Sequence, residues 1–181
     1  MWPEPDSPTP ARHKWVERDR TLAQVLHRAS ARPGLLLLMA ATSRLGDGVV
    51  WYAAMLALPF VGGHAGVPCA LRMLLLGLLN QLVYRILKRH FARPRPFVAC
   101  PGVRACARCL DEHSFPSGHT LHAVSFGMLL TAYYPGSAWL VWPFVALVAA
   151  SRVVLGLHFP SDVVVGAAMG WVMAFGVLNL F

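Results

Sequence analysis

An all-α fold embedded in a membrane is predicted, with a bundle of about five transmembrane helices and an N-terminal amphipathic helix on the membrane surface. Two observations predict it. Hydrophobic residues make up 56% of the 181 residues and charged residues only 13%, whereas a soluble domain usually carries about 25% charged residues. In addition, five stretches contain, or nearly contain, the roughly 20 apolar residues that a helix needs to cross a bilayer: 47–63, 66–87, 118–135, 137–157 and 160–181.

The N-terminal region, residues 1–32, is expected to precede a single membrane-embedded domain formed by residues 33–181. Its first ten residues are rich in proline and are expected to be disordered. From Trp15 to Arg28, apolar and charged residues alternate with the spacing of an amphipathic helix on the membrane surface; a solvated, fraying tail is the alternative. No apolar core with a small-residue cleavage site is present in this region, so no secretory signal peptide is expected.

The predicted spans begin beside residues that favour helix starts. Asp47 opens the first, Gly118 the third and Pro160 the fifth. Asp47 is expected to cap its helix because Asp is a good N-cap; a role near the catalytic face is the alternative. An earlier apolar run, PGLLLLMAA at 33–41, is too short to cross a bilayer alone. It is either a half-helix or the front of a longer, broken span that ends at Phe60.

The chain is basic, with a formal net charge of +8. When the spans are placed in order, nearly every Lys and Arg falls on the side that receives the N-terminal region, the loop 88–117 and the turn 151–160. These residues are expected to contact lipid headgroups and phosphate. Nucleic acid is not expected as a partner, because no aromatic and basic platform lies outside the spans. The positive-inside tendency makes this face cytoplasmic, so that a reporter fused to the C-terminus would lie on the opposite side.

Three polar segments fall on this same side of the predicted bundle: KRHFARPRP with Lys88 and Arg95, PSGH with Ser117, Gly118 and His119, and SRVVLGLHFPSD with Arg152, His158 and Asp162. Unpaired cations at the edge of a low-dielectric layer are costly, and Asp162 is the one acid in these segments. A doubly charged anion is therefore the expected partner of Lys88, Arg95 and Arg152, since Arg offers a planar fork and Lys a point charge to phosphate oxygens.

The PSGH segment is predicted to complete a phosphate site. Ser117 is predicted to begin a helix. Gly118 has no side chain that would keep a ligand from the backbone. The free N–H groups of a first helical turn, with the helix dipole behind them, bind anions. His119 stands beside this turn, where it can protonate a departing oxygen.

His158 is predicted to be the nucleophile. Asp162 lies four residues later, close enough to fix the tautomer of the ring and to stabilise its cationic form. A phospho-histidine would form and then be hydrolysed with His119 as the base. Taken singly, each residue has a plainer explanation, because a histidine near a helix start is usually a cap or a packed polar group and juxtamembrane cations often only meet headgroups.

These segments resemble the signature of the type 2 phosphatidic acid phosphatase superfamily, K-x6-R-P, P-S-G-H and S-R-x5-H-x3-D, at Lys88–Pro96, Pro116–His119 and Ser151–Asp162 without a mismatch. The resemblance implies a helical membrane phosphatase that needs no metal or other cofactor, of the kind found in the bacterial cytoplasmic membrane. It implies that His158 is the nucleophile, Asp162 its partner and His119 the general acid. The phosphate-binding residues that it implies are Lys88, Arg95, Ser117, Gly118 and Arg152.

Bacterial members often have six spans, whereas a counterpart of their first span is not found here. The SRLGDG segment, residues 43–48, looks like the one that precedes their second span. An odd number of spans after a basic start again places the active site on the cytoplasmic face.

Other polar residues receive weaker assignments. Cys100, Cys106 and Cys109, followed by His113, could bind zinc or form a disulfide, with reduced thiols as the default. His122, one turn after His119, is expected to pack or to contact substrate, and His90 is expected at the interface.

The expected function is hydrolysis of a phosphomonoester or diphosphate of a membrane lipid: a polyprenyl diphosphate, phosphatidic acid or phosphatidylglycerophosphate. Two alternatives stay open. A lipid phosphotransferase would use the same intermediate and pass the phosphoryl group to another alcohol. A non-catalytic lipid-phosphate-binding protein would need neither histidine. The sequence indicates no oligomeric state.

Overall fold

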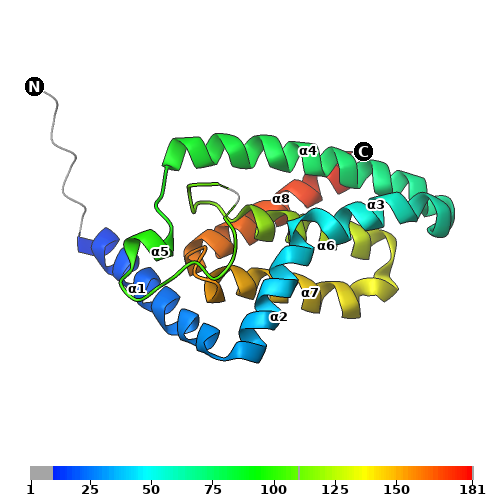
Figure 1. The fold of residues 1–181 in the computed structure, drawn as a ribbon. Coiled ribbons are helices and arrows are strands. Elements are labelled where there is room, and N and C mark those ends of the chain that lie inside the picture. Colours follow the sequence, from blue (N-terminus) through cyan, green and yellow to red (C-terminus); the bar gives the residue numbers. More distant parts are fainter. Residues whose placement is uncertain (1–9, 110, 181) are drawn as a thin grey trace, which may run out of the picture.

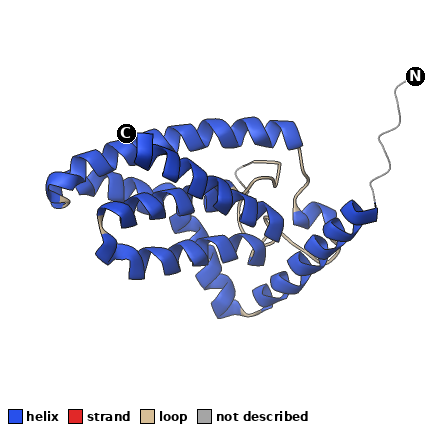
Figure 2. Cartoon of the chain, turned by 180° about the vertical axis from the view of Figure 1, so that it is seen from behind, coloured by secondary structure: helices blue, strands red, loops and turns tan. Residues whose placement is uncertain are grey.

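The computed structural model describes residues 10–109 and 111–180, which form a bundle of helices (Figure 1). The helices are α1 Pro10–His27, α2 Pro33–Arg44, α3 Val50–Val61, α4 Gly66–Phe91, α5 Pro96–Ala99, α6 Gly118–Tyr133, α7 Ala138–Val154 and α8 Pro160–Leu180. No strand occurs in the described part of the chain (Figure 2), so the all-α prediction is confirmed there. The disorder predicted for residues 1–10 lies outside the described residues, apart from Pro10, which begins α1.

Helix α6 packs against α4, α7 and α8. Its contact with α8 depends on two glycines: a Cβ on Gly166 would lie 2.6 Å from the carbonyl oxygen of Ser117, and one on Gly170 would lie 2.4 Å from that of Leu121. The Ser117 N–H also donates to the carbonyl of Asp162 at 3.1 Å. The starts of α6 and α8, which carry two of the three polar segments, are therefore held side by side.

Three helical segments of the described chain are long and apolar enough to cross a membrane: Gly63–Ala99, Pro135–Val154 and Pro160–Leu180. The prediction of five spans is thus only partly confirmed. Helix α3 has 12 residues and α6 has 16, which at 1.5 Å per residue is about 18 Å and 24 Å, short of a hydrocarbon layer of roughly 30 Å. The apolar stretches are longer than these helices because the first contains a bend and the third runs on to Pro135, beyond the end of α6.

The region before α3 is a broken helix. Residues Leu45–Val49 join α2 to α3 in a bend where Gly48 has φ +130°, a conformation that favours glycine. Of the two alternatives for the PGLLLLMAA run, the broken segment that continues toward Phe60 agrees with this geometry. The bend matters for the site, because Asp47 lies inside it.

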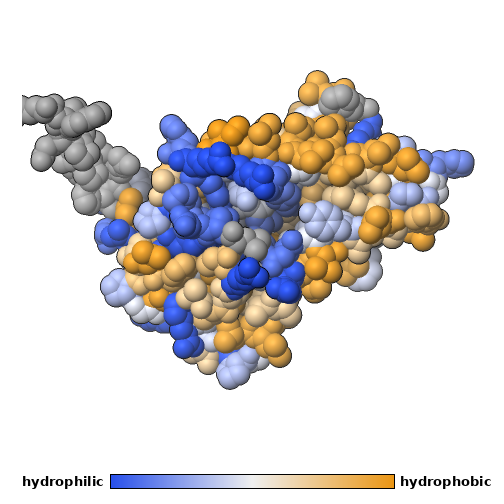
Figure 3. Space-filling view, turned by 45° about the horizontal axis from the view of Figure 1, so that its top comes forward, coloured by the Kyte–Doolittle hydropathy of each residue, from blue (hydrophilic) through white to orange (hydrophobic). Residues whose placement is uncertain are grey.

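The outer surface of the bundle is largely apolar, whereas hydrophilic side chains gather at the end where α4 stops and α5 and the following loop lie (Figure 3). Leu78 and Leu82 on α4 and Trp171 on α8 are each more than half exposed, as expected of surfaces that meet lipid. The predicted N-terminal helix is formed as α1, which exposes Trp15 and Leu22. Its position on a membrane surface stays a prediction.

Candidate active site

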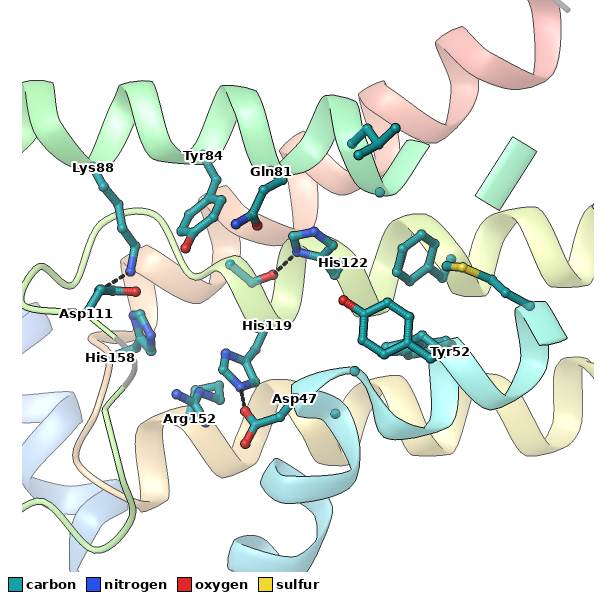
Figure 4. Close-up of a pocket in the computed structure, with 18 of the residues that line it drawn as sticks. Asp47, Tyr52, Gln81, Tyr84, Lys88, Asp111, His119, His122, Arg152 and His158 are labelled. Carbon is teal, nitrogen blue, oxygen red and sulfur yellow. Dashed lines mark hydrogen bonds and ion pairs between the residues drawn. The ribbon is translucent and has the colours of Figure 1, made fainter. Parts of the chain in front are cut away.

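A cavity of about 410 Å³ lies at the polar end of the bundle, between the α2–α3 bend, α4, α6 and the segments that follow α4 and α7 (Figure 4). Residues from all three polar segments line it: Lys88, Arg95, Gly118, His119, Arg152 and His158. The convergence that the order of the spans predicts is therefore present. Ser117 and Asp162 are fully buried behind this lining.

Lys88 and Arg95 meet at a carboxylate that sequence reasoning missed. Lys88 Nζ donates to Asp111 Oδ1, and Arg95 Nη2 donates to the same oxygen at 2.8 Å. Burial raises the pKa of Asp111, but the ion pairs with Lys88 and Arg95 outweigh burial and leave the pKa below its usual 3.8. An anionic oxygen thus already stands between these two cations, where a phosphate oxygen would find the same donors.

Arg152 supplies the third cation and is 2% exposed. Its Nη1 donates to the hydroxyl of Ser43, while its Nε has no hydrogen-bond partner among the described residues. A buried donor without a partner costs free energy. An anion in the cavity would supply the missing acceptor.

Ser117 caps α6. Its side chain accepts from the Thr120 N–H at 3.5 Å and shares a hydrogen bond of 3.0 Å with the Thr120 hydroxyl. The hydroxyl oxygen therefore serves the helix start, and the phosphate contact expected of Ser117 stays a prediction. Gly118 does line the cavity, and a Cβ there would lie 3.3 Å from the Tyr84 ring.

His158 is 1% exposed, and its Nε2 lies 3.4 Å from Arg95 Nη1. Because arginine only donates, Nε2 is the acceptor and the ring hydrogen resides on Nδ1. Nδ1 lies 3.7 Å from Asp162 Oδ2, within ion-pair range and beyond hydrogen-bond range. Burial and then the surrounding cations, Arg152 first, hold the pKa of His158 well below its usual 6.5. The ring is therefore neutral, and Nε2 keeps an electron pair on the side of the cations.

His119 has a carboxylate partner from a distant part of the chain. Its Nε2 is hydrogen-bonded to Asp47 Oδ1, and Figure 4 shows the ring between Asp47 and the part of the cavity that holds His158. Because a carboxylate only accepts, Nε2 carries the hydrogen and Nδ1 is left for other partners. The predicted capping role of Asp47 is wrong: Val49 occupies the N-cap of α3, and no side chain caps that helix. The bend at Leu45–Val49 instead turns Asp47 inward.

The remainder of the cavity is apolar and aromatic. It is lined by side chains of α3, α4 and α6, including Trp51, Tyr52, Met55, Leu74, Leu78 and Phe126. Tyr52, Leu74 and Leu78 are also more than half exposed on the outside of the bundle. The apolar part of the cavity therefore continues to the surface that meets lipid.

The other histidines and the cysteines that the sequence analysis considered lie at the edge of the cavity or outside it. His122 lines the cavity and bonds through Nδ1 to the Gly118 carbonyl at 2.8 Å, and His90 is exposed next to the Phe91 ring. All four cysteines are free thiols, and the described residues contain no group of three His, Cys, Asp or Glu side chains placed to hold a metal ion. The zinc site and the disulfide considered for the loop are accordingly not formed here.

A model of a known protein family matches most of the predicted membrane-embedded domain, residues 33–181. The family model described as the PAP2 superfamily matches residues 69–181. The chain is 31% identical over 154 residues to the decaprenylphosphoryl-5-phosphoribose phosphatase of Mycolicibacterium smegmatis, an alignment that covers 82% of this chain and 80% of that protein. Three other curated relatives are matched over only 44%, 30% and 33% of their own length.

Two crystal structures share the fold. LpxE of Aquifex aeolicus superposes with a TM-score of 0.77 at 25% identity, over 88% of this chain and 93% of that one. A transmembrane PAP2-type phosphatidylglycerolphosphate phosphatase from Bacillus subtilis superposes with a TM-score of 0.71 at 23% identity, over 95% of this chain and 87% of that one.

Proposed function

The chain belongs to the PAP2 superfamily of membrane lipid phosphatases, and we propose that it hydrolyses a phosphomonoester or diphosphate of a membrane lipid through a phospho-His158 intermediate. It is an integral membrane protein with several helical spans. One observation carries the proposal: the unprotonated Nε2 of His158 lies beside the Arg95 guanidinium in a cavity that Lys88, Arg152 and His119 share.

The proposed reaction has two steps. The electron pair of His158 Nε2 forms a bond to phosphorus, the bond from phosphorus to the lipid oxygen breaks, and His119, protonated on both ring nitrogens, gives its Nδ1 proton to that oxygen. Water then attacks the phospho-histidine and gives a proton to His119, inorganic phosphate leaves, and His158 is restored. Asp162 stabilises the positive charge that His158 gains in the first step.

Charge on the phosphoryl oxygens is stabilised by groups that are already in place. Lys88, Arg95 and Arg152 surround the polar end of the cavity, and the N–H groups at the start of α6 add the positive end of a helix dipole. We propose that these groups do the work that a metal ion does in other phosphatases.

The apolar part of the cavity supports a lipid as substrate. A headgroup phosphate beside His158 would leave its tail along α3 and α4, toward the bilayer. Polyprenyl diphosphates, phosphatidic acid and phosphatidylglycerophosphate all fit this description, because prenyl and acyl tails make similar apolar contacts. Two similar proteins are named as a decaprenylphosphoryl-5-phosphoribose phosphatase and a phosphatidylglycerolphosphate phosphatase, which supports a lipid phosphate as substrate. We place the site on the cytoplasmic face, as the charge distribution favours.

The test is phosphate release by the purified full-length protein from each of these three lipids in detergent micelles containing excess EDTA. We expect release from at least one lipid and none from the His158→Ala variant. A strict requirement for Mg²⁺ would refute the metal-free mechanism, and lipid binding without release would favour the non-catalytic alternative. Transfer of the phosphoryl group to an added alcohol, in preference to water, would favour the phosphotransferase.

A further inference from the structure

Asp162 is held in place by groups that lie outside the cavity. The carboxylate is fully buried. Its Oδ2 accepts from the Phe159 N–H at 2.8 Å, and its Oδ1 accepts from Arg93 Nη1 at 2.6 Å. Both oxygens are thus engaged, and Arg93 supplies the charged contact that holds this carboxylate behind His158.

Arg93 is in turn fixed on several sides. The same Nη1 donates to the Ser161 hydroxyl at 2.8 Å, Nη2 donates to Asp19 Oδ2 at 2.7 Å, and the guanidinium lies 4.0 Å from the centre of the Phe159 ring. One guanidinium thus bridges two carboxylates, which Arg can do because its donors form a planar fork.

Asp19 belongs to α1, the N-terminal helix. Its side chain is 11% exposed, and its Oδ1 accepts from the Ser161 N–H at 3.0 Å, in the first turn of α8. The same carboxylate accepts from the Ser161 hydroxyl. Asp19 therefore binds the start of α8, where the free N–H groups favour a negative charge, as well as Arg93.

The combined charge of Asp19, Arg93 and Asp162 favours a cationic His158. Asp19 and Asp162 carry two negative charges, and Arg93 between them carries one positive charge. One negative charge remains, next to a ring that becomes positive when it bonds to phosphorus. Without Asp19, Arg93 would neutralise Asp162 and leave His158 facing a neutral pair.

We propose that Asp19 and Arg93 are positioning residues of the active site, which hold Asp162 in place and preserve its negative charge toward His158. The N-terminal helix α1 is then part of the catalytic apparatus as well as a surface element. This inference rests on the proposed function, because it assigns a role relative to the phospho-His158 intermediate.

The experiment is steady-state kinetics of Asp19→Asn in the full-length protein, with the best lipid phosphate from the screen. Asn keeps an oxygen for the Ser161 N–H, removes the negative charge and puts an NH2 donor in place of Oδ2, the oxygen that accepts from Arg93. We expect kcat to fall about tenfold to a hundredfold, by analogy with the loss when the hydrogen-bonding partner of a metal-ligating side chain is removed. KM should stay within about twofold because the phosphate-binding cations are untouched. Glu17→Gln is the matched control, since it removes the same charge from an exposed ion pair on the same helix, and Asp19→Glu should recover most of the activity.

The effect of Asp19→Asn is then measured again in an Asp162→Asn background at raised enzyme concentration. If Asp19 acts through Asp162, the second substitution should lower kcat no further. The inference would be overturned if Asp19→Asn lowered kcat equally in both backgrounds. It would also be overturned if Asp19→Asn alone left kcat within about twofold of wild type, or changed only KM. Should Asp19→Asn fail to fold, Arg93→Lys, which keeps one charge but loses the planar fork that bridges the two carboxylates, should show the same fall in kcat. If the wild-type protein hydrolysed none of the lipid phosphates, the proposed function itself would be refuted.

Discussion

The two histidines of the cavity differ in how closely their carboxylates hold them. His158 lies deep inside the bundle, and Asp162 stands 3.7 Å from its Nδ1. His119 lies at the start of α6 with its side chain 13% exposed, and Asp47 is hydrogen-bonded to its Nε2. The first ring directs the electron pair of its Nε2 toward the cations, and the second is hydrogen-bonded to a carboxylate that can stabilise its protonated form. This difference suits a nucleophile and an acid–base group respectively.

The largest effects are expected from removing either ring. His158→Ala and His119→Ala should each reduce turnover of a lipid phosphate by at least about a hundredfold. They should differ with p-nitrophenyl phosphate, whose leaving group departs without a proton. His119→Ala should then release one p-nitrophenolate per enzyme in a rapid burst, followed by slow turnover, because the phospho-histidine forms but is not hydrolysed. His158→Ala should give no burst.

Stopped-flow absorbance of p-nitrophenolate measures this burst, with the wild-type protein as the reference for active-site concentration. A burst from His158→Ala would assign the nucleophile to another residue. If neither variant gave a burst while both folded normally, the division of roles between the two rings would be wrong.

A smaller effect is expected at Asp47. Asp47→Asn keeps the shape of the side chain but removes the charge that stabilises protonated His119. We expect kcat for a lipid phosphate to fall about tenfold to a hundredfold, and the burst with p-nitrophenyl phosphate to remain. Introducing Asp47→Asn into His119→Ala should cause no further loss, because its partner is already gone. A further loss there would show that Asp47 supports the bend at Leu45–Val49 and has no specific role toward His119.

The same comparison shows which parts of the site a sequence can reveal. Asp162 could be paired with His158 from the sequence because it lies only four positions later, in the first turn of the helix that follows. Asp47 lies 72 residues from His119, and only the bend at Gly48 directs it inward, so local reasoning assigned it to a cap. Asp19 and Arg93 were missed for the same reason, since their contacts join α1, the loop after α4 and α8. The order of the predicted spans could place the three polar segments at one membrane face, because that inference does not require the positions of side chains.

The helices themselves were predicted less evenly. Long apolar stretches identified α4, α7 and α8, because length and hydropathy are properties of the sequence alone. The lengths of α3 and α6 were overestimated, because a positive φ at Gly48 and the end of α6 before Pro135 are conformational facts that hydropathy does not encode.

The smallest effect is expected at Asp111, whose carboxylate lies among the phosphate-binding cations. Its Oδ1 contacts both Lys88 and Arg95, so a substrate phosphate must displace it to reach the same donors. Asp111→Asn removes a competing anion, and we expect KM for a lipid phosphate to fall about threefold to tenfold with kcat within about twofold. Inhibition by inorganic phosphate should tighten by a similar factor, because phosphate meets the same competitor. Glu112→Gln, an exposed acid in the same loop, is the control for net charge and should change neither constant. A rise in KM would mean that Asp111 serves to orient Lys88 and Arg95 and does not compete with the substrate.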